Sequence, residues 1–425
     1  MTPSWLPRPS VPAGLVLLAA LRFSAAAAAA AAAAPAAPAV DACAWLTGQM
    51  SVQSAPAVFL ASYPDAEPGP LRHAAFLYDN ALAAIALTGC ERLAEARRIG
   101  DALLLALDHD RFWHDGRLRN GYLAGAVGAA PLKLAGWWSS RDQRWLEDNY
   151  QAGSDTGNLA WAMLALLTLE RSAHVHDPGY RDGRYLAGAR RLGAWLAGQR
   201  DRRGAGGFTG GSFGSETAPR AQQWKSTEHN IDLAAAFAWL AASSGDAHWR
   251  ALSQDASRFV EAMWDGQRGA FDAGTGEDGV TRNSLLALDA QVWPLLALPD
   301  AAARYHPAYA KGAQQLRTRD GAGYAYSQAG GGAWIEGTAM TELLRKLLGS
   351  EAGAPAAVAA IGLARAPDGG YFATTTAELP TGFMLDTDPA QPRVYRHLEH
   401  LGAAAWVALC DRGVNPFTAA RSLPH

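Results

Sequence analysis

The sequence predicts an all-α fold, an (α/α)6 barrel in which six inner helices are enclosed by six outer helices. Three observations support this prediction. Six Ala- and Leu-rich runs each begin beside an acidic residue, the acids are separated by 47–76 residues, and amphipathic stretches lie between the runs. These intervals leave room for two helices and a loop, but they vary too much for a solenoid of fixed period. The acids are Asp79, Asp155, Glu228, Asp289, Glu336 and Glu399.

The run that follows each acid carries no polar face, which indicates a helix that is buried on every side. Residues 80–87 and 158–167 are nearly all apolar, and residues 231–239 and 401–409 repeat the pattern with many alanines. We therefore expect six inner helices that begin near Asn80, Asn158, His229, Ala290, Gly337 and His400.

Four stretches between these runs carry charges at helical spacing and predict outer helices: residues 91–107, 184–200, 248–264 and 301–316. Small residues let the inner helices approach closely, and amphipathic outer helices shield them from water. In a closed ring all inner helices point the same way, so their N-terminal ends meet at one mouth. We expect the acids to converge there, with small β-hairpin loops around them.

Residues 1–40 have features of a secretory signal peptide; the alternative is an unprocessed Ala/Pro-rich tail. The apolar stretch 11–21 is shorter than the roughly 20 residues that span a bilayer, and Ala37-Pro38-Ala39 offers a small-residue cleavage site. We therefore expect a secreted or periplasmic protein in which residues 41–425 form a single catalytic domain.

Composition limits the partners that the chain can have. The net charge is only −3, so no strongly basic surface points to nucleic acid. No stretch after the signal peptide is long and uncharged enough to cross a membrane, and the three cysteines lack the spacing of a metal site. We expect a monomer that uses no cofactor and no metal.

Two of the cysteines suggest a disulfide. Cys90 lies eleven residues after Asp79, and Cys410 lies eleven residues after Glu399, so both should sit at the same height on the first and sixth inner helices. These helices are neighbours when the ring closes, and a Cys90–Cys410 bridge would tie them together in an oxidising compartment. The alternative is two buried free thiols, because neighbouring helices are often too far apart for the Cα separation of about 4.4–6.8 Å that a disulfide needs.

Four segments resemble the inner-helix entrances of the six-hairpin glycosidase superfamily: Tyr78-Asp79-Asn80-Ala81, Asp155-Thr156-Gly157-Asn158, Lys225-Ser226-Thr227-Glu228-His229-Asn230 and Trp334-Ile335-Glu336-Gly337-Thr338. The resemblance covers the chain after about residue 41, and it is one of architecture and motif style. It implies an enzyme acting on carbohydrate, since members of this superfamily are mostly glycoside hydrolases, with some polysaccharide lyases and sugar epimerases.

The acids must be weighed as helix caps before they are assigned to catalysis. Asp is a preferred N-cap, so Asp79 and Asp155 could simply stabilise their helices. Glu is not a favoured N-cap, which makes Glu228, Glu336 and Glu399 stand out, Glu228 most of all. Glycosidic bond cleavage needs one protonated carboxyl group and one ionised carboxylate. We predict Glu228 as the general acid and expect the base among Asp79, Asp155 and Glu336.

Other polar and aromatic residues near the predicted helix starts are candidates for substrate binding. Trp224 and Trp334 could stack on sugar rings, and the remaining side chains could orient hydroxyl groups or complete the wall of the mouth. The full set is Tyr78, Asn80, Asn158, Trp224, Lys225, His229, Trp334, Tyr395, His397 and Glu399.

The favoured function is a glycoside hydrolase that cleaves a polysaccharide or oligosaccharide, and two alternatives stay open. A polysaccharide lyase or sugar epimerase would use a Tyr or His for proton exchange, and it could bind a uronate carboxylate through a cation such as Lys225, Arg119 or Arg396. A noncatalytic polysaccharide-binding toroid is the other alternative.

Overall fold

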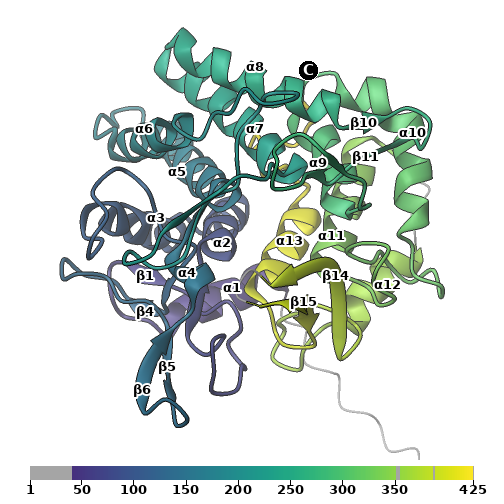
Figure 1. The fold of residues 1–425 in the computed structure, drawn as a ribbon. Helices are drawn as coiled ribbons and strands as arrows, with labels where there is room; N and C mark the ends of the chain where they lie inside the picture. Colours follow the sequence, from purple (N-terminus) through teal and green to yellow (C-terminus); the bar gives the residue numbers. More distant parts are fainter. Residues whose placement is uncertain (1–40, 351–354, 386–387, 425) are drawn as a thin grey trace, which may run out of the picture. The chain divides into compact units, whose positions relative to one another are not determined.

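Six inner helices form a closed ring. A computed structural model describes residues 41–350, 355–385 and 388–424, except the side chains at 307–311 and 388–389; the expected signal peptide therefore lies outside the described residues. Each inner helix packs against the next, and α13 packs against α2, which closes the ring (Figure 1). The helices are α2 (Leu77–Gly89), α5 (Thr156–His176), α7 (Thr227–Ser244), α9 (Leu288–Ala297), α11 (Ile335–Leu347) and α13 (Leu401–Arg412). Their starts match the six predicted ones and confirm the (α/α)6 barrel.

The inner helices are buried because their sequences leave no side that could face water. In α13 every residue from Leu401 to Cys410 is buried. Local signals set the ends: the side chain of Ser226 accepts the backbone N–H of His229 at the start of α7, and Gly245 ends that helix in a left-handed conformation.

Outer helices cover this ring. Their bounds are α1 (Ala42–Ser51), α3 (Leu93–Asp108), α6 (Arg184–Ala197), α8 (Ala247–Ala262), α10 (Ala301–Gln315) and α12 (Pro355–Leu363). Helices α3, α6, α8 and α10 correspond to the four predicted amphipathic stretches. Helix α1 was not predicted; it packs against both α13 and α2. The polypeptide therefore begins its ring with an outer helix and ends it with an inner one.

The disulfide prediction was wrong in its pairing. Cys90 is bonded to Cys43, with a Cα–Cα distance of 5.8 Å, and Cys410 is a buried free thiol. Cys43 lies in α1, which crosses the end of α2 where Cys90 is the C-terminal cap. The sequence patterns did not predict a helix at residues 42–51. Cys43 was therefore not considered as a partner for Cys90, and Cys410 was paired with it instead. The bridge links an outer helix to an inner one.

Short strands and one short helix, α4 (Asn149–Ala152), occupy the connections between helices. The longest pair is an antiparallel hairpin of β14 (Glu378–Leu385) and β15 (Asp388–Arg396). The remaining sheets are β1 (Val58–Phe59) with β4 (Gly125–Ala126), β2 (Ala74–Phe76) with β3 (Gly121–Leu123), β5 (Gly136–Ser139) with β6 (Arg144–Glu147), β8 (Gly211–Phe213) between β7 (Ser154–Asp155) and β9 (Arg220–Gln222), β10 (Trp264–Asp265) with β11 (Ala270–Phe271), and β12 (Gly274–Thr275) with β13 (Arg282–Asn283).

Two features are absent from the part of the chain that the structure describes. None of its helices is both long and apolar enough to cross a membrane. Nor does it contain a group of three or more His, Cys, Asp or Glu side chains that could hold a metal ion.

Candidate active site

His400 joins the first turns of two inner helices. It is the N-cap of α13, and its Nε2 lies 3.3 Å from Asp79 Oδ2 in α2 while its Nδ1 lies 3.3 Å from Glu336 Oε1 in α11. Tyr63 stacks on the imidazole with a centroid distance of 4.6 Å. Gly402 leaves the necessary room, because a Cβ there would lie 2.8 Å from Asp79 Oδ1. We name His400, Asp79 and Glu336 the histidine–carboxylate cluster.

The electrostatics of this cluster keep His400 protonated at neutral pH. Burial alone would lower the pKa of His400, but the carboxylates of Asp79 and Glu336 outweigh it and raise the pKa to about 10. The buried imidazolium thus stabilises two carboxylates beside it.

Glu336 is held by further donors. The hydroxyl of Tyr78 donates to Glu336 Oε2 at 3.1 Å, and Trp334 Nε1 donates to Oε1 at 3.3 Å. Trp406 Nε1 in turn donates to the Tyr78 hydroxyl at 2.7 Å. By contrast, the described residues give Asp79 no side-chain donor besides His400. The Asp79 carboxylate therefore has fewer side-chain donors around it than Glu336 and more room for a further hydrogen-bond donor such as water.

Glu228 and Asp289 form a coupled carboxyl pair between α7 and α9. Burial and the neighbouring Asp289 raise the pKa of Glu228 well above its usual range. Burial also raises the pKa of Asp289, to about 6, although hydrogen bonds from the Ala290 backbone and from Tyr326 oppose the shift. Such a pair retains a proton at a pH where an exposed carboxyl group has lost it.

Asp232 lies one helical turn deeper than Glu228 on the same helix and is fully buried. Neither of its carboxylate oxygens has a hydrogen-bond partner of ordinary geometry among the described residues, and the same holds for Trp161 Nε1. Burial and the charges of Glu228 and Asp289 raise its pKa strongly, and the Trp161 indole partly offsets this. A third acid with a raised pKa therefore lies beneath the carboxyl pair.

Asp155 begins α5 in a network of amides. Asn120 Oδ1 accepts the Asp155 backbone N–H at 2.6 Å and the Asn158 amide at 2.8 Å. The same Asn158 amide donates to the Tyr150 hydroxyl at 3.1 Å. Burial and the Asp155 carboxylate raise the pKa of Tyr150 to about 12. The side chain of Asp155 makes no cap hydrogen bond to α5, so capping does not explain its position.

His229 is neutral, in contrast to His400. Its Nδ1 lies 3.0 Å from Thr156 Oγ1, and Trp224 packs beside the ring at 5.4 Å. Burial and the charge of Arg393 lower the pKa of His229 to about 3. Gly157 makes the contact possible, since a Cβ there would lie 2.5 Å from the imidazole.

Arg393 brings a positive charge from the β14–β15 hairpin, and the sequence patterns did not reveal it. Alternate residues of a strand share a face, so Arg393 lies on the same face as Tyr395, which packs 5.6 Å from Trp334. Its guanidinium carbon lies 5.0 Å over the Tyr150 ring, and its charge lowers the pKa of Glu228. The hairpin thereby reaches α4 and the start of α5.

Solved structures of similar fold span most of the chain. A wild-type glycosidase aligns over 87% of this chain and 94% of its own, with 16% identity and a TM-score of 0.57. A cellobiose 2-epimerase from Bacillus thermoamylovorans B4167 aligns over 86% of this chain and 96% of its own, with 10% identity and a TM-score of 0.58. The chain has the six-hairpin glycosidase fold. An alpha-amylase from Clostridium perfringens with this fold aligns over 87% and 96%, with 9% identity and a TM-score of 0.57. No protein-family model and no curated protein matches the chain.

Within this six-hairpin glycosidase fold, four of the predicted binding residues make contacts outside the carboxyl pair and the histidine–carboxylate cluster. Asn80 is buried and pairs with the backbone of Leu60 at 2.8 and 3.0 Å. His397 is exposed, with Nδ1 2.6 Å from the Thr374 carbonyl. Glu399 lies beside Asp368, and burial together with that carboxylate raises its pKa to about 7. The residue that reaches the mouth is instead His400, one position later.

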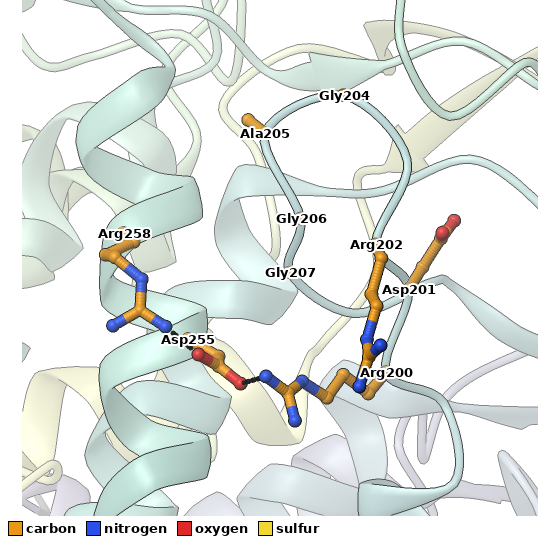
Figure 2. Close-up of a pocket in the computed structure, with 9 residues that line it drawn as sticks. All are labelled: Arg200, Asp201, Arg202, Gly204, Ala205, Gly206, Gly207, Asp255 and Arg258. Carbon is orange, nitrogen blue, oxygen red and sulfur yellow. Dashed lines mark hydrogen bonds and ion pairs between the residues drawn. The ribbon is translucent and has the colours of Figure 1, made fainter.

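Lys225 is the fourth. Its Nζ donates to the carbonyls of Arg203 and Gly206 at 2.7 and 2.9 Å and lies 3.5 Å from Asp201, so it supports the loop before α7. This loop borders a cavity of about 250 Å³ in which Asp255 lies between two arginines (Figure 2). The lining residues are Arg200, Asp201, Arg202, Gly204, Ala205, Gly206, Gly207, Asp255 and Arg258.

Proposed function

We propose that this protein is a glycoside hydrolase in which Glu228 protonates the leaving oxygen and Asp79 activates water. One observation carries the proposal: the mouth combines a carboxyl pair that retains a proton with carboxylates that a buried imidazolium stabilises. Hydrolysis of a glycosidic bond needs these two states together. The ring order also favours it, because α7, which carries Glu228, lies opposite α13, which carries His400.

Each group has a defined part in the reaction. Glu228 transfers its proton to the glycosidic oxygen as the bond to the anomeric carbon breaks, and Asp289 stabilises the protonated form beforehand. Asp79 takes a proton from the water that attacks that carbon. Glu336, held by Tyr78 and Trp334, supports the charge of His400, and His400 in turn contacts Asp79.

Sugar epimerisation is the second candidate, because two of the solved structures of this fold are epimerases. The histidines argue against it. His229 has a pKa of about 3 and is a weak base, and His400 is a cation with a carboxylate facing each ring nitrogen. Neither is suited to remove a proton from carbon near neutral pH.

We also propose a secreted or periplasmic location and a polysaccharide or oligosaccharide substrate. The location rests on the composition of residues 1–40 and on the Cys43–Cys90 bridge, since disulfides persist mainly in oxidising compartments. The substrate class rests on the likeness of fold.

Product mass distinguishes the reactions. The protein is incubated with panels of neutral and acidic oligosaccharides in ¹⁸O-labelled water, and the products are analysed by mass spectrometry. Hydrolysis yields two shorter sugars, of which the one with the new anomeric hydroxyl gains one labelled oxygen, and Asp79→Asn should slow their formation roughly 10²–10⁴-fold. A product with the mass of the substrate would indicate epimerisation, and an unsaturated product would indicate elimination; either result would contradict the proposal.

A further inference from the structure

Arg393 differs from the other cations that could bind substrate. Arg119 is buried in ion pairs with Asp110 at 2.6 Å and Glu216 at 2.9 Å, Arg396 pairs with Glu378, and His400 faces two carboxylates. Among the side chains that the structure describes, no carboxylate forms an ion pair with Arg393. Within that described set, its charge is available to a ligand.

The position of Arg393 directs that charge towards the acids. Thr381 Oγ1 donates to the Arg393 carbonyl at 2.9 Å and fixes the backbone of the hairpin there. The side chain is exposed to solvent, yet its charge acts on Glu228, His229 and Tyr395. The guanidinium is therefore both accessible and close enough to Glu228 for its charge to act on the proposed proton donor.

Among the described side chains, phenols lie beside Arg393. Tyr150 lies beneath the guanidinium at 5.0 Å, and Tyr395 occupies the same strand face. A guanidinium offers parallel N–H donors to a planar anionic group, and phenol hydroxyls add further donors. A neutral sugar would leave this charge without a counterion.

We propose that Arg393 binds an anionic substituent of the sugar, either the carboxylate of a uronic acid or a sulfate ester. The proposal deepens the glycoside hydrolase function and rests on it. It assigns acidic glycosides as the preferred substrates, because Arg393 offers them a cation. The anion must lie at Arg393, since the carboxylates of the mouth would repel it elsewhere.

The test measures binding separately from turnover. Glu228→Gln protein, which retains the mouth but lacks the proposed proton donor, is titrated calorimetrically with D-glucuronate, D-galacturonate, glucose 6-sulfate, D-glucose and D-galactose. At least one anionic sugar should bind more tightly than its neutral counterpart. Adding Arg393→Gln should weaken that binding roughly 10- to 100-fold and leave the neutral sugars unchanged, because a hydrogen-bonded charge is lost.

Arg396→Gln is the matched control, since this arginine lies on the same strand but pairs with Glu378. It should keep the preference for the anionic sugar, and melting temperatures should show that all variants are folded. The proposal is overturned if no anionic sugar is preferred, if the preference survives Arg393→Gln, or if that variant loses neutral and anionic sugars equally. Hydrolysis is measured separately with the wild-type protein. If it hydrolyses only neutral glycosides, the inference about Arg393 is refuted and the proposed hydrolase function stands. If anionic sugars bind but no glycoside is hydrolysed, the hydrolase function is refuted and the inference about Arg393 stands.

Discussion

At the residue scale, the chemistry depends on which of the buried side chains are charged and which are neutral. His400 is a cation because Asp79 and Glu336 outweigh its burial, whereas His229 is neutral because burial and Arg393 act in the same direction. The sequence places both histidines at helix starts and cannot separate them, since the difference arises from residues distant in the chain.

This difference gives a testable pH dependence. The pKa of His400 rises from 6.5 to about 10 on folding, so its contribution to the free energy of unfolding is complete below pH 6.5 and is lost as the pH rises through about 10. In chemical denaturation, the stability difference between wild type and His400→Gln should shrink across this range. His397→Gln, which changes an exposed histidine, should run parallel to wild type. Parallel curves for His400→Gln as well would contradict a charged His400.

Candidate site residues were predicted best where the signal is local. Glu228, Asp79 and Glu336 follow from an acid placed before a buried helix, and the structure brings all three to the first turns of inner helices. Tyr63, Tyr326 and Arg393 lie in connections whose placement depends on long-range packing. Only the alternation of Arg393 with Tyr395 along a strand could have indicated one of them.

At the element scale, the inner helices were predictable because nearly every consecutive residue in them is small or apolar. Helix α13 has small and apolar residues on all sides, so its pattern allows few other structures. Helix α1 has no such run of apolar residues, and α9 contains Pro294 in its interior. The sequence pattern therefore predicts these two helices less clearly. The hairpin of β14 and β15 depends on pairing between strands and on Gly382, whose φ is +86°.

The link between α1 and α2 predicts a specific thiol count. Alkylation of the unfolded but unreduced protein should modify one of the three cysteines, Cys410, and peptide mapping should find Cys43 linked to Cys90. Reduction, or the double change of Cys43 and Cys90 to Ala, should lower the unfolding free energy by about 2–4 kcal/mol. Cys410→Ala is the control for thiol connectivity, because it should leave this bridge intact. Three alkylated cysteines would contradict the pairing.

At the scale of the whole described unit, the ring explains why residues from separate hairpins act together. Closure between α13 and α2 places His400 beside Asp79, and the packing of α7 against α9 places Glu228 beside Asp289. The six-hairpin glycosidase fold could be predicted from the sequence because its repeat recurs along the chain. The reaction could not, since it depends on the protonation of groups that meet only after folding.

The central claim is that Glu228 donates the proton to the leaving group, and the most direct test compares two substrates of Glu228→Gln. The amide keeps the shape but has no proton to transfer, so turnover of an unactivated glycoside should fall roughly 10²–10⁴-fold. An aryl glycoside with a good leaving group needs little protonation and should lose much less. Glu399→Gln, at another helix start but beside Asp368, should match wild type on both. Full activity of Glu228→Gln on both substrates, or an equal loss on both, would contradict the account.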